Sequence, residues 1–127
     1  MKKNRKTILF TLGLTVITSV SVLAAKGLPV QGQSGGGTAY EGYVEGSADL
    51  YNCYGATTTI KLKGSEDVYA YVEIVNAEGY KIGNGTANIG KDKAYSGTVT
   101  RSGGKNAYGS VGTASGSSRA FASLYRK

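Results

Sequence analysis

The stretch VYAYVEIV, Val68–Val75, decides the fold class of this chain, because its residues alternate strictly between two kinds. Aliphatic residues occupy every second position, namely Val68, Ala70, Val72 and Ile74. The positions between them hold two aromatic residues and an acid, Tyr69, Tyr71 and Glu73. Successive side chains of an extended strand point to opposite faces, so this pattern predicts a strand with one buried face and one partly wet face.

Shorter alternating runs before this stretch indicate further strands. SADLYNCY, residues 47–54, predicts one of them, and TTTIKL, residues 57–62, predicts another. In TTTIKL, the residues that we expect to point inward are Thr58, Ile60 and Leu62. Those that we expect to point outward are Thr57, Thr59 and Lys61. The segment KGSED, residues 63–67, supplies the turn into the next strand.

The chain ends in a further patterned run, SSRAFASLYRK, residues 117–127. One expected face holds small or apolar side chains, Ala120, Ala122 and Leu124. The other holds larger or polar ones, Arg119, Phe121, Ser123 and Tyr125. This pattern predicts a closing strand that packs its small face closely against a second sheet.

Glycine-containing turn signals separate the runs. Asn84-Gly85 predicts a two-residue hairpin, SGG at 102–104 a second hairpin, and SGS at 115–117 the turn into the closing strand. No segment shows a sustained helical period. We therefore predict an all-β chain: a small antiparallel β-sandwich, or alternatively a small β-barrel, of seven or eight short strands joined largely as a meander.

The first residues are typical of an export signal. Four basic residues, Lys2, Lys3, Arg5 and Lys6, precede the apolar stretch TILFTLGLTVITSVSVLAA. The small residues at its end predict cleavage after Ala24, with Ala25 as the alternative, while the length of the stretch leaves an uncleaved anchor open. We expect a signal peptide over residues 1–24, a flexible leader rich in Gly, Ser and Gln over 25–38, and a β domain over 39–127 of a secreted, extracellular protein.

Composition excludes several classes of chemistry. The chain has no histidine and one cysteine, Cys53, so His-based catalytic triads, thiolate metal sites and a disulfide framework are excluded. We expect no cofactor, no metal and no enzymatic activity, although the acidic residues leave a carboxylate-dependent hydrolase as a remote alternative. Cys53 is expected to be buried, and an intermolecular disulfide is the alternative.

The aromatic residues indicate a contact surface. The chain has ten tyrosines, all after residue 38, but two phenylalanines and no tryptophan. Tyrosine combines a rigid contact area with a hydrogen-bonding tip, which suits recognition surfaces. The candidate contact surface comprises Lys61, Tyr69, Tyr71, Lys105, Tyr108, Arg119, Phe121, Tyr125 and Arg126. The alternative is that these rings form cross-strand pairs that only stabilise a sheet.

The charges are divided between the two halves of the exported part. Residues 25–78 carry three basic and seven acidic residues, whereas residues 79–127 carry eight basic residues and one acid, Asp92. The basic half could be attracted to an anionic component of a cell envelope, or it could pair with the acidic half within the fold or between copies. Export argues against nucleic acid as the partner, and no nucleic-acid-binding motif is present.

Two segments resemble the small, secreted lactococcin-like bacteriocins: YAYVEIVNAEG, residues 69–79, and KNAYGSVGTASGSSRAFASLYRK, residues 105–127. The absence of Trp and His and a longer front part depart from that family. The resemblance implies a β-sandwich and an antibacterial protein that acts at the envelope of Gram-positive cells, on the anionic precursor of the wall. It assigns no role to any single residue.

Three functions follow from the sequence. The first is a secreted, non-enzymatic protein that binds a cell-surface or cell-envelope target, with an antibacterial role as its most concrete form. The second is a secreted structural or matrix subunit that associates with copies of itself, by strand edges or through Cys53. The third, remote function is the carboxylate-dependent hydrolase.

Overall fold

The computed structural model describes residues 24–126, so the predicted signal segment lies almost wholly outside the described residues. Residues 24–126 form strands and turns and contain no helix, which confirms the all-β class. Ten strands are present rather than seven or eight: β1 Ala25–Lys26, β2 Val30–Gln33, β3 Ala39–Ala48, β4 Asn52–Lys63, β5 Val68–Val75, β6 Thr86–Gly90, β7 Lys93–Tyr95, β8 Val99–Ser102, β9 Asn106–Thr113 and β10 Arg119–Ser123. None of this part of the chain forms a helix long and apolar enough to cross a membrane.

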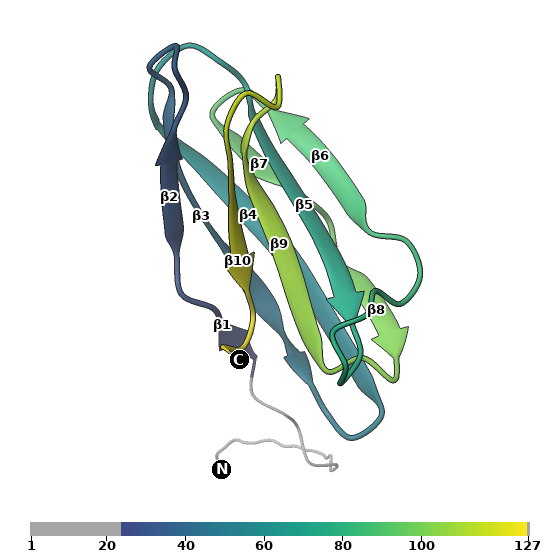
Figure 1. The fold of residues 1–127 in the computed structure, drawn as a ribbon. Coiled ribbons are helices and arrows are strands. Elements are labelled where there is room, and N and C mark those ends of the chain that lie inside the picture. The colour runs from purple at the N-terminus through teal and green to yellow at the C-terminus, as the bar shows by residue number, and fades with distance from the viewer. Residues whose placement is uncertain (1–23, 127) are drawn as a thin grey trace, which may run out of the picture.

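The strands form two antiparallel sheets that face each other (Figure 1). In the first, here called sheet A, β3 pairs with β4, β1 and β2 pair with the free side of β3, and β7 and β8 pair with the far side of β4. In the second, sheet B, the order is β10-β9-β5-β6. Side chains of both sheets share the same hydrophobic clusters, so the core lies between the two sheets.

The connections differ from the expected meander, because the chain crosses between the sheets after β4, β6 and β8. The SGG turn at 102–104 is one of these crossings and not a hairpin, since β8 pairs with β4 and β9 pairs with β5. Asn84-Gly85 also forms no two-residue hairpin. It lies at the end of a ten-residue connection between β5 and β6 that turns earlier, at Gly79. The predicted turn at 115–117 does join β9 to β10.

The predicted faces are confirmed for β5 and, as far as Leu124, for the closing strand β10. Val68, Ala70, Val72 and Ile74 are fully buried, and β5 begins and ends at the expected residues. In and just after β10, Ala122 and Leu124 are buried against the same cluster, while Phe121 on the opposite face is exposed. Alternation was a sufficient guide here because one set of positions is aliphatic and the other is not.

The predicted faces of β4 were wrong. Thr57 and Thr59 point inward and are fully buried, whereas Leu62, expected inside, is 54% exposed. Thr58 and Ile60 share the outer face of sheet A with Tyr43 and Glu41 of β3. Threonine occurs on both faces of this strand, so its alternation shows which residues share a face but not which face is buried.

Part of the segment predicted as a flexible leader belongs to sheet A. Ala25 and Lys26 pair with Gly46 and Glu45, and Val30–Gln33 pairs with β3. Between them, Gly27 donates to the Val44 carbonyl oxygen at 2.7 Å. It also lies so close to β10 that a Cβ on Gly27 would be 2.0 Å from the Ser123 carbonyl oxygen. Polar composition suggested a linker here, but backbone pairing and close packing hold the segment in place.

The predicted strand over 47–54 is interrupted by a hairpin turn at residues 49–51, with the end of β3 before it and the start of β4 after it. The Asp49 carboxylate accepts hydrogen bonds from the Tyr51 and Asn52 amides at 2.8 and 2.7 Å, which fixes the turn. Cys53, just after it, is fully buried as expected. Burial raises the pKa of the Cys53 thiol to about 11, so the thiol stays protonated at neutral pH.

Candidate functional site: an aromatic groove on sheet B

The outer face of sheet B brings five of the nine predicted contact residues together. Strand pairing places them in adjacent cross-strand rows. One row runs from Tyr69 through Gly112 to Arg119, and the next from Tyr71 through Ser110 to Phe121. The third runs from Glu73 through Tyr108 to Ser123. The five are therefore Tyr69, Tyr71, Tyr108, Arg119 and Phe121.

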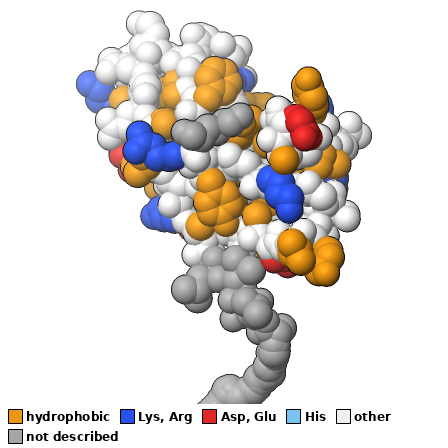
Figure 2. Space-filling view, turned by 60° about the horizontal axis from the view of Figure 1, so that its bottom comes forward, with side chains coloured by type: hydrophobic (Ala, Val, Ile, Leu, Met, Phe, Trp, Pro, Cys, Tyr) orange, Lys and Arg blue, Asp and Glu red, His pale blue; other side chains and the backbone are white. Residues whose placement is uncertain are grey.

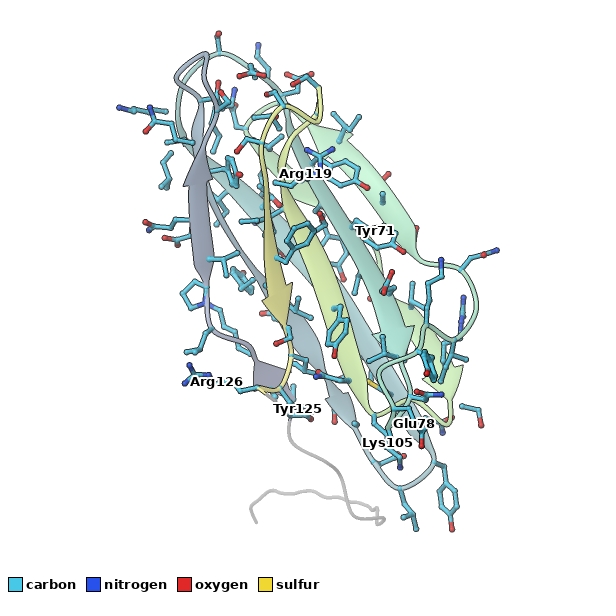
Figure 3. All side chains as sticks on the ribbon, in the orientation of Figure 1. Tyr71, Glu78, Lys105, Arg119, Tyr125 and Arg126 are labelled. Carbon is cyan, nitrogen blue, oxygen red and sulfur yellow. The ribbon has the colours of Figure 1, made fainter. Side chains whose placement is uncertain are left out.

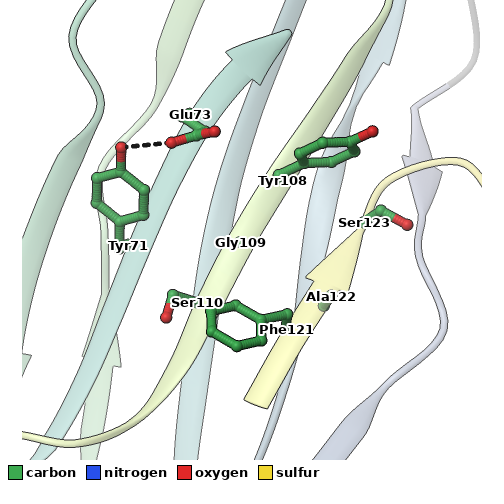
Figure 4. A pocket seen from close by; sticks show the side chains of 8 residues that line it. All are labelled: Tyr71, Glu73, Tyr108, Gly109, Ser110, Phe121, Ala122 and Ser123. Atoms are coloured by element: carbon green, nitrogen blue, oxygen red, sulfur yellow. Dashed lines mark hydrogen bonds between the residues drawn. The ribbon is translucent and has the colours of Figure 1, made fainter. Parts of the chain in front are cut away.

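A hollow of about 450 Å³ lies across the second and third rows, and we call it the sheet B groove. Its lining residues are Tyr71, Glu73, Tyr108, Gly109, Ser110, Phe121, Ala122 and Ser123 (Figure 4). The hollow exists because small residues alternate with rings across the strands. Ser110 separates Tyr71 from Phe121, so the space over the middle strand is left open. Phe121 is 74% exposed, although it is one of the largest apolar side chains in the chain.

Tyr71 and Glu73 form the polar side of the groove. The Tyr71 hydroxyl donates to Glu73 Oε1 at 2.7 Å, along the same face of β5. Burial, followed by this hydrogen bond, raises the pKa of Tyr71 to about 12, so the hydroxyl remains a donor at neutral pH. The second carboxylate oxygen of Glu73 points toward the Tyr108 side of the hollow (Figure 4).

Arg119 lies beside the groove but is engaged within the chain. Its guanidinium lies over the Tyr69 ring, 4.0 Å from the ring centroid. It also donates to the carbonyl oxygens of Thr113 and Ser118. These contacts hold Arg119 against the β9–β10 turn, so it braces the tip of this hairpin.

The other predicted contact residues lie elsewhere. Lys105 and Arg126 lie at the opposite end of the molecule from Arg119 (Figure 3). The Lys105 ammonium donates to the Leu50 carbonyl oxygen at 3.2 Å. Lys61 belongs to sheet A, where its side chain is mostly buried and its Nζ lies 3.7 Å from Asp92 Oδ1.

Tyr125 was expected on the same face as Phe121 but turns away from it. Its amide donates to Asn106 Oδ1, and its carbonyl oxygen accepts from Asn106 Nδ2, both at 2.9 Å. The Asn106 side chain thus takes the place of a backbone partner beyond the end of β10. The Tyr125 hydroxyl then accepts a hydrogen bond from the Ala48 amide of sheet A at 3.1 Å. Tyr125 therefore ties the two sheets together instead of lining the groove.

The basic residues of the predicted contact surface form no single patch, because Lys105 and Arg126 lie at the opposite end from Arg119 and Lys61 lies on sheet A. On the end seen in Figure 2, Lys and Arg side chains are separated by hydrophobic and neutral ones. Across the described part of the chain, the one ion pair within 4.0 Å joins Lys61 to Asp92. On this end the basic side chains are therefore dispersed, and within the described residues close ion pairing of the two halves is limited to Lys61 and Asp92.

Two acidic residues outside the groove have environments opposite to that of a general acid. Glu66 accepts hydrogen bonds from the Ser34 and Ser115 hydroxyls at 2.5 and 3.1 Å, which ties three loops together. These bonds, the Ser34 one foremost, lower the pKa of Glu66. The Asn52 and Tyr51 amides lower that of Asp49. A general acid at neutral pH needs a raised pKa, so both carboxylates are turn-fixing groups.

The groove residues that the predicted contact surface did not include are Glu73, Gly109, Ser110, Ala122 and Ser123. Gly109 and Ser110 matter because they are small. A small residue leaves open space for a ligand only where the strand register places it between two rings. Glu73 was predicted on the outer face, and its position beside Tyr71 in VYAYVEIV was the available signal. Within residues 24–126 no cluster of three or more His, Cys, Asp or Glu side chains could hold a metal ion.

No protein-family model, curated protein or solved structure matches this chain. The function is therefore argued from the groove and the sequence.

Proposed function

We propose that this chain is an exported, non-enzymatic β-sandwich protein that binds a cell-surface or cell-envelope target through the sheet B groove. The observation that carries the proposal is the groove itself, an open hollow of about 450 Å³ bordered by Tyr71, Tyr108 and Phe121. Specific binding sites are concave and mostly apolar, with a few polar groups that orient the ligand, and Glu73 with the Tyr71 hydroxyl supplies those groups here.

The groove favours binding over catalysis. Glu73 is the one carboxylate among its lining residues, whereas a glycoside hydrolase of the usual type uses two. The rings instead offer contact area that costs little conformational entropy when a ligand binds, because tyrosine and phenylalanine have two side-chain torsions. An antibacterial role remains the most concrete form of this function, and it rests on the export signal and the resemblance to the lactococcin-like bacteriocins.

The self-association route through Cys53 finds less support. The Cys53 thiol is fully buried in the core between the two sheets. Its raised pKa keeps it in the unreactive protonated form. Association through strand edges would leave the groove without a role, so binding through the groove is the better explanation of the exposed Phe121 ring.

The test is binding to whole cells. The protein, as processed and purified from an exporting host, is added to growing cultures of several Gram-positive species. The fraction that sediments with the cells, the growth rate and the cell shape are scored. We expect sedimentation with at least one species, and growth arrest or altered septa if the antibacterial form of the proposal is correct.

A pair of variants locates the binding surface. Phe121→Ala removes an exposed ring from the groove, and Tyr80→Ala removes an exposed ring from the β5–β6 connection. We expect Phe121→Ala to lower the cell-bound fraction and Tyr80→Ala to leave it unchanged. Equal binding by wild type and Phe121→Ala, with both proteins folded, would refute the proposal.

A further inference from the structure

We propose that the sheet B groove holds a trimethylammonium group carried by the target. This inference rests on the proposed function, because it names the chemistry that the same groove would recognise. It replaces the anionic target expected from net charge with a cationic one at this surface.

The spacing of the strands sets the size of the site. Tyr71 and Phe121 lie on strands separated by β9, with Ser110 between them in the same row. Neighbouring strands are ~5 Å apart, so a group resting over Gly109 and Ser110 has Tyr71 on the strand to one side and Phe121 on the strand to the other. The row therefore places one ring on either side of the position that a cation would take, and aromatic rings attract cations at short range. Tyr108 supplies a third ring from the next row.

The charge of the lining residues favours a cation. Glu73 is the one acid, and neither lysine nor arginine lines the groove. Arg119, in the neighbouring row, already lies over Tyr69 and donates to Thr113 and Ser118. An anion in this hollow would meet the Glu73 carboxylate and three electron-rich rings, with no basic partner among the lining residues. A cation would be attracted by all four groups.

The chain already binds its own cations in this way. On sheet B, the Arg119 guanidinium lies 4.0 Å from the Tyr69 centroid. On the outer face of sheet A, the Lys26 ammonium lies 4.1 Å from the Tyr43 centroid, and Lys26 pairs directly with Glu45 across the strands. On sheet A, a tyrosine thus has a cation over its ring, and a carboxylate is the cross-strand neighbour of that cation without forming an ion pair within 4.0 Å. The sheet B groove has the tyrosine and the carboxylate but no cation of its own.

The lining also selects the kind of cation. A primary ammonium has three N–H donors and loses several water contacts on burial, which rings cannot replace. A trimethylammonium group has no donor, spreads its charge over methyl groups and fills an apolar hollow. Aromatic groups bordering a hollow are a known means of recognising quaternary ammonium ions.

The experiment titrates choline into the purified chain and follows the amide resonances of Gly109 and Ser110 by NMR. Two comparison ligands accompany it: 3,3-dimethyl-1-butanol, which has the shape of choline without the charge, and n-butylammonium, which has the charge without the methyl groups. We expect saturable shifts of these resonances with choline, and at least about tenfold weaker binding of each comparison ligand.

Two groove variants and one control test the location. Ser110→Ile keeps a β-compatible residue but fills the floor, and should remove choline binding. Glu73→Gln keeps the shape but removes the charge, and should weaken binding about five- to tenfold. Ser102→Ile makes the same change on the exposed outer side of sheet A and should have no effect. If Ser110→Ile does not fold, Phe121→Ala provides the second test of location.

Each outcome decides between the proposals. Equal binding of the neutral alcohol would show an apolar groove without charge selection and overturn the inference, as would equal or tighter binding of n-butylammonium. If no ligand binds while Phe121→Ala still lowers cell binding, the ammonium inference fails and the proposed function stands. If no ligand binds and Phe121→Ala binds cells normally, both fail.

Discussion

The inner faces of the two sheets are built from opposite kinds of residue. Sheet B presents aliphatic side chains to the core, from β5 the residues Val68, Ala70, Val72 and Ile74, and from β9 Ala107 and Val111. In the corresponding part of sheet A, most inward positions of β3 and β4 are glycine or threonine: Gly42, Gly46, Gly55, Thr57 and Thr59. Both faces are buried, yet only one looks hydrophobic in the sequence.

The difference shows that sheet B supplies volume and sheet A supplies room at two glycines of sheet A, while at Gly109 of β9 the roles are reversed, since a Cβ there would lie 2.6 Å from Val44 Cγ2. A Cβ on Gly42 would lie 2.3 Å from Val111 Cγ1, and a Cβ on Gly55 would lie 2.5 Å from the Ala107 methyl. The valines and alanines of sheet B therefore occupy the space that glycine leaves on sheet A. Close packing of a core requires that summed volume fit the space, not that both sides be bulky.

The largest expected effect on stability comes from adding one methyl group to the core at Gly55. Gly55→Ala should lower the free energy of unfolding by about 2 kcal/mol, because its methyl overlaps that of Ala107. The double variant Gly55→Ala with Ala107→Gly restores the total volume and should recover more than half of the loss. Urea denaturation of the wild type, of Gly55→Ala and Ala107→Gly alone, and of the double variant measures both effects.

The matched control for that experiment is Gly35→Ala, where a Cβ would have no atom within 4 Å. It should leave the free energy of unfolding within about 0.5 kcal/mol of wild type. A double variant no more stable than Gly55→Ala alone would contradict the complementary packing of the two sheets.

A second test asks whether the inner face of sheet A is as dry as that of sheet B. Burial raises the pKa of Cys53 to about 11 from an ordinary value near 9. The protonated thiol is favoured in the folded state, so its contribution is complete below pH 9 and is lost as the pH rises toward 11. That loss is on the order of 2 kcal/mol.

Unfolding midpoints in urea at pH 8, 9, 10 and 11, for wild type and Cys53→Ala, measure this contribution. The fall of the wild type should exceed that of the variant between pH 9 and 11. Tyr71, with a pKa raised to about 12, should add a decline in both proteins between pH 10 and 12. Parallel profiles up to pH 11 would show that water reaches the thiol.

A third test compares two inward threonines of β4 that differ in hydrogen bonding. Thr59 Oγ1 donates to the Tyr69 carbonyl oxygen of sheet B at 2.7 Å. Within the described residues, Thr57 Oγ1 is buried without any hydrogen-bond partner. Thr59→Val should therefore cost about 1 kcal/mol, whereas Thr57→Val should stabilise the fold by up to about 1 kcal/mol. Thermal or urea unfolding gives both signs, and equal costs would show that Thr57 is satisfied in solution.

The smallest expected effect concerns the outer face of sheet A, which carries a cation contact that the groove lacks. Lys26→Met keeps the apolar stem of the side chain but removes the ammonium over Tyr43. We expect a loss of about 0.5 kcal/mol, reduced further at high salt, because the contact is near the surface. Unfolding in low and high salt measures it. A loss that does not change with salt would point to packing of the stem instead.

The sequence predicted those elements in which the side chains alone distinguish the two faces. The alternation of β5 identified its buried residues, and Phe121 was correctly placed outside. For β4 the same rule failed, because Thr57 and Thr59 are buried opposite the bulky sheet B and nothing in TTTIKL records what faces it. Which face of β4 is buried was decided by the sheet packed against it, and not by the residues of the strand itself.

The candidate site was predictable to a similar extent. Tyr71, Tyr108 and Phe121 were singled out as outward aromatic residues, and they do border one hollow. Ser110 was not, because its role depends on lying between two rings in a row that only the register defines. Lys61 and Tyr125 were grouped with the rings by composition, but Lys61 lies on β4 in the other sheet and the Asn106 side chain turns Tyr125 away from the groove.

The position of Gly27 against Ser123 has a consequence for the order in which the chain can fold. The strands on either side of Gly27, β1 and β2, lie near one end of the described chain, and β10 lies near its other end. The first strands to be synthesised can therefore complete their packing only after the last strand has been made. Sheets joined by such distant pairings form on the order of milliseconds to seconds, later than local structure. Until β10 has been made the chain lacks its completed sandwich, and an incompletely folded chain is what the proposed export through a translocation channel requires.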